Sequence, residues 1–200
     1  MKLQVKAAIR IVAGVLGSGS FLLAIIPEKA VIEAAAEPTD QLQTRKGFVQ
    51  QYENANIPES LTINGLDINA TIKPVGVDEN FAFEVPSAEF VGWYKFGSYP
   101  GSQGSTVLAA HVDYAGKEGV FFNLSDLLPG DPLTVEAGNK ILRYEVTSVT
   151  SYDKESLPID DLFTKNGPET LQLITCDGDF DQQMRSYKNN LVVTARPIAI

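Results

Sequence analysis

An alternation of apolar and polar residues with a period of two, which begins after Pro58, is the feature that most constrains the fold of this chain. Apolar side chains occupy every second position in four short segments, residues 61–63, 66–72, 81–85 and 142–146. Three more segments, residues 107–109, 171–174 and 191–193, are more continuously apolar. Alternation is typical of strands with one buried face, and short continuous apolar runs fit strands buried on both faces. The pattern therefore predicts seven or eight short strands.

Turn-forming residues separate these segments and narrow the fold class. Proline, glycine and asparagine readily adopt the backbone angles that tight turns require. They occur at Asn64-Gly65, Pro74, Pro86, Pro100-Gly101, residues 129–131, Gly138-Asn139 and Gly167-Pro168. Because no long amphipathic pattern lies between them, we predict an all-β barrel or sandwich, with a short helix or turn within residues 119–127.

The N-terminal segment differs in character from the rest of the chain. Residues 7–26 are apolar or small except for Arg10, and Lys2 and Lys6 precede them. A run of about 20 such residues can cross a bilayer as a helix, and basic residues before it favour a cytoplasmic N-terminus. We therefore predict a single-pass membrane anchor over residues 1–27, a stalk or linker over residues 28–57, and an extracellular catalytic domain over residues 58–200. A buried core helix and a signal peptide cleaved near residues 34–36 are the alternatives.

The net charge of −9 argues against one class of partner. Without Lys2, Lys6 and Arg10, the remainder of the chain carries 13 basic against 25 acidic residues. Phosphate backbones would repel such a domain, so we expect no nucleic-acid partner. One cysteine and one histidine can form neither an internal disulfide nor a zinc site made of Cys and His ligands, and we expect no metal and no cofactor.

The single cysteine and the single histidine, Cys176 and His111, mark the expected active site. They follow two apolar runs, residues 171–175 and 106–110, that are typical of strands. A thiol attacks a carbonyl only as the thiolate, and with an ordinary pKa near 8.5 about 3% of a free cysteine is ionised at pH 7. The site must therefore either shift this equilibrium or work through a minority form. We predict Cys176 as the nucleophile and His111 as the general acid and base.

Acyl transfer also requires a donor for the oxyanion that develops on the attacked carbonyl. Arg185, nine residues after Cys176, could return from a loop into the next strand and point at the thiol. We prefer it to Lys188, because a guanidinium offers a fixed fork of donors and stays charged. Lys188 better suits an exposed loop position.

Several phrases of the sequence resemble the sortases of Gram-positive bacteria. Residues 171–176 are similar to the Thr-Leu-x-Thr-Cys signature of that family, and residues 109–113 are similar to its catalytic-histidine segment. The flanking phrases, most similar to class F and class E-like members, lie at residues 75–78, 91–94, 100–101, 120–122, 128–131 and 185–193. The resemblance runs from about residue 58 to the C-terminus and includes the N-terminal anchor.

The resemblance implies an eight-stranded sortase-type β-barrel with short helices, preceded by an N-terminal transmembrane helix. It implies cleavage of a Leu-Pro-x-Thr-Gly-like C-terminal sorting signal on a surface protein, after the Thr, through a thioacyl enzyme. The acyl group then passes to an amine on a peptidoglycan precursor or a pilin. Carried over, Cys176 is the nucleophile, His111 the general acid and base, and Arg185 the substrate and oxyanion donor. Thr175 and Ala110 are the expected substrate contacts.

Two residues depart from the family pattern. Asp177 stands where relatives often have Gly, and Ala110 stands where a Gly is expected before the histidine. An inward-facing Asp177 carboxylate would raise the pKa of the thiol by like-charge repulsion. Residues 151–167 lie where sortases have the loop that reads the sorting signal.

The sequence leaves alternative functions open. An L,D-transpeptidase is also an exported Cys/His enzyme, but its Ser-x-Gly-Cys-x-Arg context and preceding His-Gly do not occur here. A catalytically silent sortase-like barrel could instead act as an assembly or binding module, in which Cys176 would react no faster than an ordinary thiol. Residues 177–181 resemble the start of a calcium loop. Gln182 stands at the sixth position, where that loop has a glycine, and Lys188 stands at the twelfth position, where it has a glutamate. A looser calcium site remains a further alternative.

Overall fold

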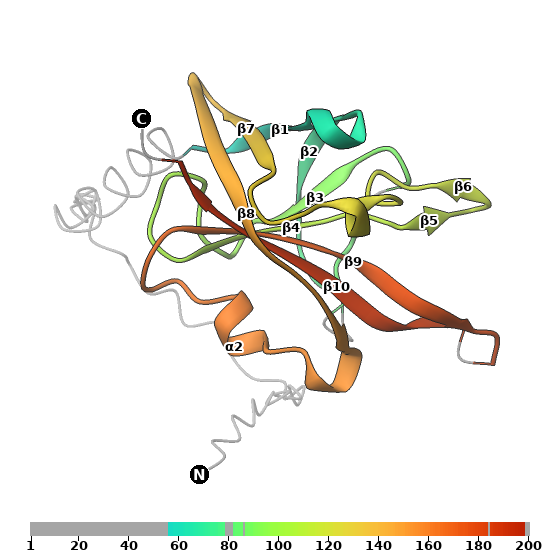
Figure 1. The fold of residues 1–200 in the computed structure, drawn as a ribbon. Helices are drawn as coiled ribbons and strands as arrows, with labels where there is room; N and C mark the ends of the chain where they lie inside the picture. Colours follow the sequence, from blue (N-terminus) through green and yellow to red (C-terminus); the bar gives the residue numbers. More distant parts are fainter. Residues whose placement is uncertain (1–55, 79–81, 86, 184, 199–200) are drawn as a thin grey trace, which may run out of the picture. The chain divides into compact units, whose positions relative to one another are not determined.

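Eight strands close into a barrel in the computed structural model, which describes residues 56–78, 82–85, 87–183 and 185–198 (Figure 1). Their order around the barrel is β1-β2-β3-β4-β9-β10-β8-β7. The strands are β1 (Pro58–Ile63), β2 (Ile68–Val75), β3 (Val91–Tyr94), β4 (Ser105–Ala109), β7 (Pro132–Ala137), β8 (Lys140–Asp153), β9 (Thr170–Asp181) and β10 (Ser186–Pro197). β2 with β3 and β4 with β9 run parallel, and the other neighbours are antiparallel. Pairing of β1 with β7 closes the sheet, so the prediction of an all-β barrel is confirmed.

Short elements fill the connections between the strands. They are η1 (Asn64–Leu66), η2 (Leu124–Asp126), η3 (Lys154–Ser156), α2 (Ile159–Leu162) and a hairpin of β5 (Asp113–Tyr114) and β6 (Lys117–Glu118). The helix or turn predicted within residues 119–127 corresponds to η2. Within the predicted strand at residues 81–85, the described part forms only an isolated bridge between Phe83 and Val77. Val77 lies just after β2, in which β1 pairs with residues 68–71 and β3 with residues 72–75.

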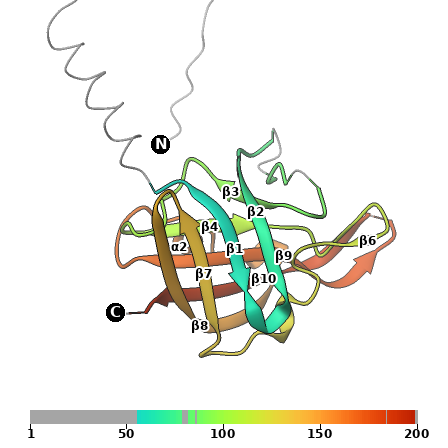
Figure 2. The same cartoon turned by 90° about the horizontal axis from the view of Figure 1, so that it is seen from above.

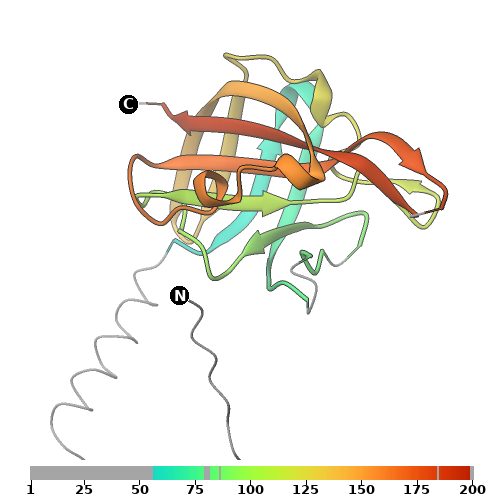
Figure 3. The same ribbon diagram turned by 90° about the horizontal axis from the view of Figure 1, so that it is seen from below.

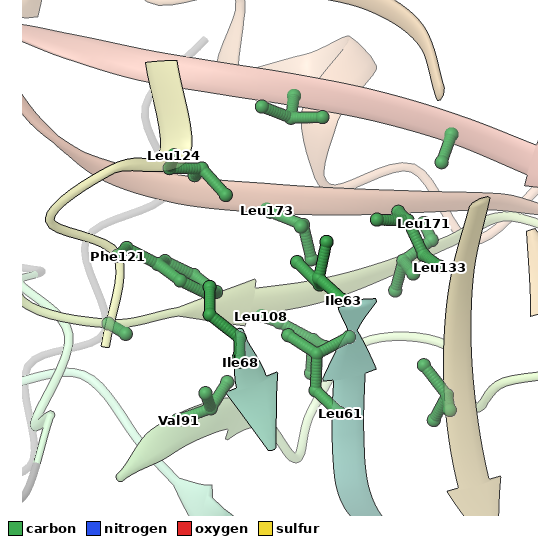
Figure 4. Packing of buried hydrophobic residues seen from close by; sticks show 14 of the residues in the cluster. Leu61, Ile63, Ile68, Val91, Leu108, Phe121, Leu124, Leu133, Leu171 and Leu173 are labelled. Carbon is green, nitrogen blue, oxygen red and sulfur yellow. The ribbon is translucent and has the colours of Figure 1, made fainter. Parts of the chain in front are cut away.

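Two apolar clusters lie on opposite faces of the sheet. The larger one fills the barrel, and Figure 4 shows Leu61, Ile63, Leu108, Leu133, Leu171 and Leu173 converging there. The smaller one combines Val107, Ala109, Ile174 and Val192, from β4, β9 and β10, with Leu162 from α2. These three strands are therefore buried on both faces, which explains why their segments are continuously apolar.

Two hairpins extend from the same end of the barrel. Figures 2 and 3 show the β9–β10 hairpin projecting beside the β5–β6 hairpin. The hydroxyl of Tyr187 on β10 donates a 2.8 Å hydrogen bond to Oδ2 of Asp113 on β5. This contact joins the strand that follows Cys176 to the segment that follows His111.

The predicted anchor over residues 1–27 lies outside the described residues, as does nearly all of the predicted stalk. The described residues fall within one compact unit, Arg45–Ile200. In the described ranges, no helix has the length and apolar character that membrane crossing requires.

Candidate active site

The parallel register of β4 and β9 brings the end of β4 beside the middle of β9, because β9 continues beyond Cys176 to Asp181 and does not end before the cysteine as the sequence predicted. Ala109 on β4 lies opposite Ile174 on β9, and the amide of Ala110 continues the ladder with a 3.2 Å bond to the Ile174 carbonyl. Neighbouring strands are about 4.8 Å apart, so two further residues along this register place His111 level with Cys176. The structure thus brings together the two residues that the sequence selected.

His111 and Cys176 line a shared cavity of about 480 Å³. Its apolar walls come from the 82–85 segment, from the end of β4, from α2 and its flanks, and from β9. The apolar wall residues are Ala82, Phe83, Val85, Ala109, Leu157, Ile159, Phe163 and Ile174. The remaining lining residues are Ala110, Lys154, Thr175 and Asn190. The cavity is therefore an apolar groove with a thiol, an imidazole and an ammonium at one side.

Thr175 in β9 is hydrogen-bonded to Ala110, the residue that follows β4. The Thr175 hydroxyl donates a buried 2.8 Å hydrogen bond to the Ala110 carbonyl oxygen. Thr175 is 5% exposed and Ala110 is 4% exposed, although both line the cavity. The bond fixes the relative positions of the residues that follow them, Cys176 and His111. Their predicted role as substrate contacts stays a prediction.

His111 is held by ring packing and by its backbone. Its ring centroid lies 4.7 Å from that of Tyr114, and Nε2 lies 3.4 Å from the Val85 carbonyl oxygen. The His111 carbonyl accepts a 3.2 Å bond from the Phe121 amide, and the Val112 carbonyl accepts a 2.8 Å bond from the Gly119 amide. The returning segment after β6 therefore packs directly against the histidine backbone.

Burial and two charges act on the half-buried Cys176 thiol. Burial is the largest effect and raises its pKa, because a desolvated thiolate is disfavoured; Lys154 lowers the pKa and Asp113 raises it. The thiolate is thus a minority form in the free enzyme at neutral pH. The carboxylate that acts on the thiol belongs to Asp113, whereas the sequence had suggested Asp177.

Arg185 and Lys188 both lie away from the cavity lining. Arg185 is exposed, with a φ of 50°, in the turn between β9 and β10. The Lys188 ammonium lies 3.2 Å from Oδ2 of Asp179, and both side chains are largely exposed. The predicted role of Arg185 as oxyanion donor therefore stays a prediction from the family resemblance.

The sequence reasoning did not select Lys154, Asp113 or Tyr187. Lys154 belongs to the 151–167 segment that the family resemblance had marked as a substrate loop, and that segment does line the cavity. Asp113 follows His111 by two residues, which was a usable signal for proximity. Tyr187 offered no comparable signal in the sequence.

A second cavity of about 640 Å³ lies between η1 with the start of β2 and the segment around β6. Among the described residues that line it, none is a cysteine or a histidine. The described ranges also contain no group of three or more His, Cys, Asp or Glu side chains placed to hold a metal ion. Nucleophilic chemistry is therefore assigned to the Cys176 cavity.

Comparisons with known proteins agree with this architecture. A family model described as the sortase domain matches residues 61–198. The sortase D5 transpeptidase of Clostridium perfringens has a similar structure, with 19% identity, a TM-score of 0.56, and coverage of 78% of this chain and 89% of that chain.

Two further structures show the same fold. Sortase C-1 from Actinomyces oris has 23% identity and a TM-score of 0.58, over 83% of this chain and 86% of that one. Sortase A from Corynebacterium diphtheriae has 20% identity and a TM-score of 0.55, over 83% of this chain and 72% of that one. No curated protein sequence matches this chain.

Proposed function

The chain belongs to the sortase family and is a cysteine transpeptidase, and we propose that it attaches surface proteins to an amine through a thioester on Cys176. The observation that carries this assignment is the shared cavity in which the only cysteine and the only histidine of the chain lie side by side. We retain class F as a prediction from the sequence phrases, since the three solved relatives described above are of the D, C and A types.

The first half-reaction makes the thioester. The thiol proton of Cys176 passes to His111, and the thiolate sulfur attacks the carbonyl carbon of the Thr in the sorting signal. The carbon–nitrogen bond to the following Gly then breaks, and His111 returns the proton to the leaving amine. Because the thiolate is scarce in the free enzyme, we expect slow acylation, consistent with a nucleophile that reacts through a minority form.

The second half-reaction transfers the acyl group. An acceptor amine attacks the thioester carbonyl carbon and gives a proton to His111. The carbon–sulfur bond then breaks, and His111 returns the proton to the sulfur, which restores the thiol. In this scheme Arg185 is the proposed donor to the oxyanion in both half-reactions, on the basis of the family resemblance. The acceptor is an amine on a peptidoglycan precursor or a pilin.

The shape of the cavity supports an apolar sorting signal. The Leu and Pro side chains of a Leu-Pro-x-Thr-Gly-like segment would pack against Phe83, Leu157 and Phe163, which are apolar residues of the cavity lining. Apolar walls with few polar groups are typical of sites that bind an extended peptide by side-chain burial. Thr175 and Ala110 would then border the scissile carbonyl.

The proposed location is the cell membrane, with the catalytic barrel outside the cell. It rests on the apolar run of residues 7–26 and the basic residues that precede or interrupt it. Protease added to intact cells should digest the barrel, and resistance of the whole chain until the cells are broken would contradict this topology.

The proposed reaction is tested with a panel of Leu-Pro-x-Thr-Gly-type peptides, an amine acceptor and the purified full-length chain. Mass spectrometry should detect cleavage after the Thr, an acyl adduct on Cys176, and transfer to the amine. The Cys176→Ala variant should give none of these products. Failure of every peptide to acylate Cys176 would favour the silent barrel as a binding module.

The thiol's reactivity toward alkylating agents does not separate these two functions. Burial raises the pKa of Cys176, so even an active enzyme is expected to alkylate more slowly than an ordinary thiol at neutral pH. Acyl-enzyme formation is therefore the deciding observation.

A further inference from the structure

Lys154 is the basic residue that lines the Cys176 cavity in the part of the chain that the structure describes. It opens η3 directly after the end of β8. Its ammonium donates a 2.7 Å hydrogen bond to the hydroxyl oxygen of Ser186, the first residue of β10. This bond ties the segment after β8 to the neighbouring strand β10 and anchors the Lys154 ammonium.

The two cations favoured by the sequence are placed differently. Arg185 is exposed in the turn of the β9–β10 hairpin, and Lys188 is paired with the Asp179 carboxylate. Lys154, in contrast, combines a position in the cavity lining with an anchor for its ammonium.

We propose that Lys154, in the lining of the same cavity, is a positioning charge that stabilises the Cys176 thiolate. The proposal rests on the proposed function, in which Cys176 is the nucleophile. Lys154 acts through the sulfur and need not touch the substrate, which distinguishes it from the oxyanion donor expected at Arg185. The electrostatic effect of Lys154 agrees with the geometry, since it lowers the thiol pKa against the upward effect of burial.

The other ionisable groups around Cys176 come from three elements and from its own strand. His111 follows β4, and Asp113 on β5 raises the thiol pKa. Tyr187 on β10 donates to Asp113, and this hydrogen bond raises the tyrosine pKa, so its hydroxyl stays neutral. Asp177 follows Cys176 in β9. Lys154 and Asp113 therefore act on the thiolate with opposite signs, and their removal should have opposite effects.

The test measures alkylation of Cys176 by iodoacetamide as a function of pH in the full-length chain. The chain has a single cysteine, so intact mass reports this residue alone. Lys154 is exposed and its charge is screened by water, so Lys154→Gln should slow alkylation near neutral pH roughly two- to fivefold and move the profile to higher pH. Lys154→Arg, which keeps the charge, should restore most of the rate.

The opposite charge gives the second arm of the test. Asp113→Asn removes the negative charge but keeps an oxygen that can accept the Tyr187 hydrogen bond, so alkylation should become faster. Salt near 1 M, where the Debye length is about 3 Å, should reduce the difference between wild type and Lys154→Gln.

A matched substitution on the β9–β10 hairpin serves as the control. Lys188→Gln removes the same charge outside the cavity lining and should leave the alkylation profile unchanged. If Lys154→Gln does not fold, Ser186→Ala, which removes the anchor and keeps the ammonium, should still slow alkylation.

An unchanged profile in Lys154→Gln, or an equal shift in Lys188→Gln, would overturn the proposal. The same holds for Ser186→Ala if it must replace Lys154→Gln and alkylates at the wild-type rate. Alkylation needs no sorting signal, so a shifted profile in a chain that never forms an acyl-enzyme would remove the proposed function and leave the Lys154–Cys176 coupling intact.

Discussion

Gly119→Ala should disable the active site through the histidine backbone. A Cβ atom built on Gly119 would lie 2.6 Å from the His111 carbonyl carbon, 3.0 Å from the His111 Cβ, and closer still to the His111 carbonyl oxygen. Ordinary contact begins near 3.4 Å, so the carbonyl carbon must move by about 0.8 Å and the oxygen by more.

Three backbone bonds limit how this overlap can be relieved. The Gly119 amide binds the Val112 carbonyl, the Phe121 amide binds the His111 carbonyl, and the Val120 amide binds the Ala88 carbonyl. Either His111 shifts or these bonds lengthen. Overpacking of this kind typically costs about 1–3 kcal/mol of stability. A displacement of about 1 Å at a catalytic group can cost about 100-fold in rate.

The assay compares kcat/KM for peptide transfer, the thermal unfolding midpoint and Cys176 alkylation. Gly119→Ala should lose about two orders of magnitude in kcat/KM, while alkylation stays within about twofold of wild type because β9 is not touched. Gly65→Ala is the matched control, since a Cβ there meets no atom within 4 Å. Wild-type kcat/KM together with a wild-type unfolding midpoint in Gly119→Ala would refute the claim that this close approach positions His111.

Three further predictions concern the nucleophile, the strand junction and pH. Cys176→Ala and His111→Ala should each abolish transfer, measured by mass spectrometry, and leave the circular dichroism spectrum unchanged, because both residues lie outside the two apolar clusters. Loss of the fold would contradict this. Thr175→Val should lower the free energy of unfolding in denaturant by about 1 kcal/mol, because it loses the buried hydrogen bond to the Ala110 carbonyl. Thr147→Val removes an exposed hydrogen bond to the Thr194 carbonyl and should leave the free energy of unfolding nearly unchanged. The raised pKa of Cys176 contributes stability below the ordinary thiol pKa, and this contribution is lost as pH rises through the folded-state pKa. In denaturant titrations above about pH 8.5, wild type should therefore lose more stability than Cys176→Ser. Parallel curves of stability against pH for the two proteins would contradict this.

The alternation of side chains predicted the barrel because strand faces are set locally. Apolar residues at every second position in residues 61–63 and 142–146 lie in β1 and β8, whose inward side chains fill the barrel. The continuously apolar runs lie in β4, β9 and β10, which are covered on both faces. The 81–85 segment carries the same alternation without a barrel strand in its described part, because alternation specifies the two faces of a strand but not a pairing partner.

The direction of the Arg185 side chain could not be predicted from its distance along the chain from Cys176. Between Cys176 and Arg185 the β9–β10 pairing shifts register, since Asn189 lies opposite Asp177 but Tyr187 lies opposite Phe180. The extra residue in β9 breaks the period-two rule that decides which face a side chain occupies. A residue nine positions after the nucleophile therefore cannot be assigned a direction from sequence spacing alone.

The sequence by itself determined the fold class and the nucleophile–histidine pair. Both follow from local properties, the period of the side chains and the presence of one cysteine and one histidine at the ends of apolar runs. Only the tertiary structure decided which charges surround the thiol. Lys154 reaches the cavity from the end of β8 and Asp113 from a separate hairpin, and their proximity depends on barrel closure and strand order. Electrostatic effects depend on distance in space, which neighbours in sequence do not fix.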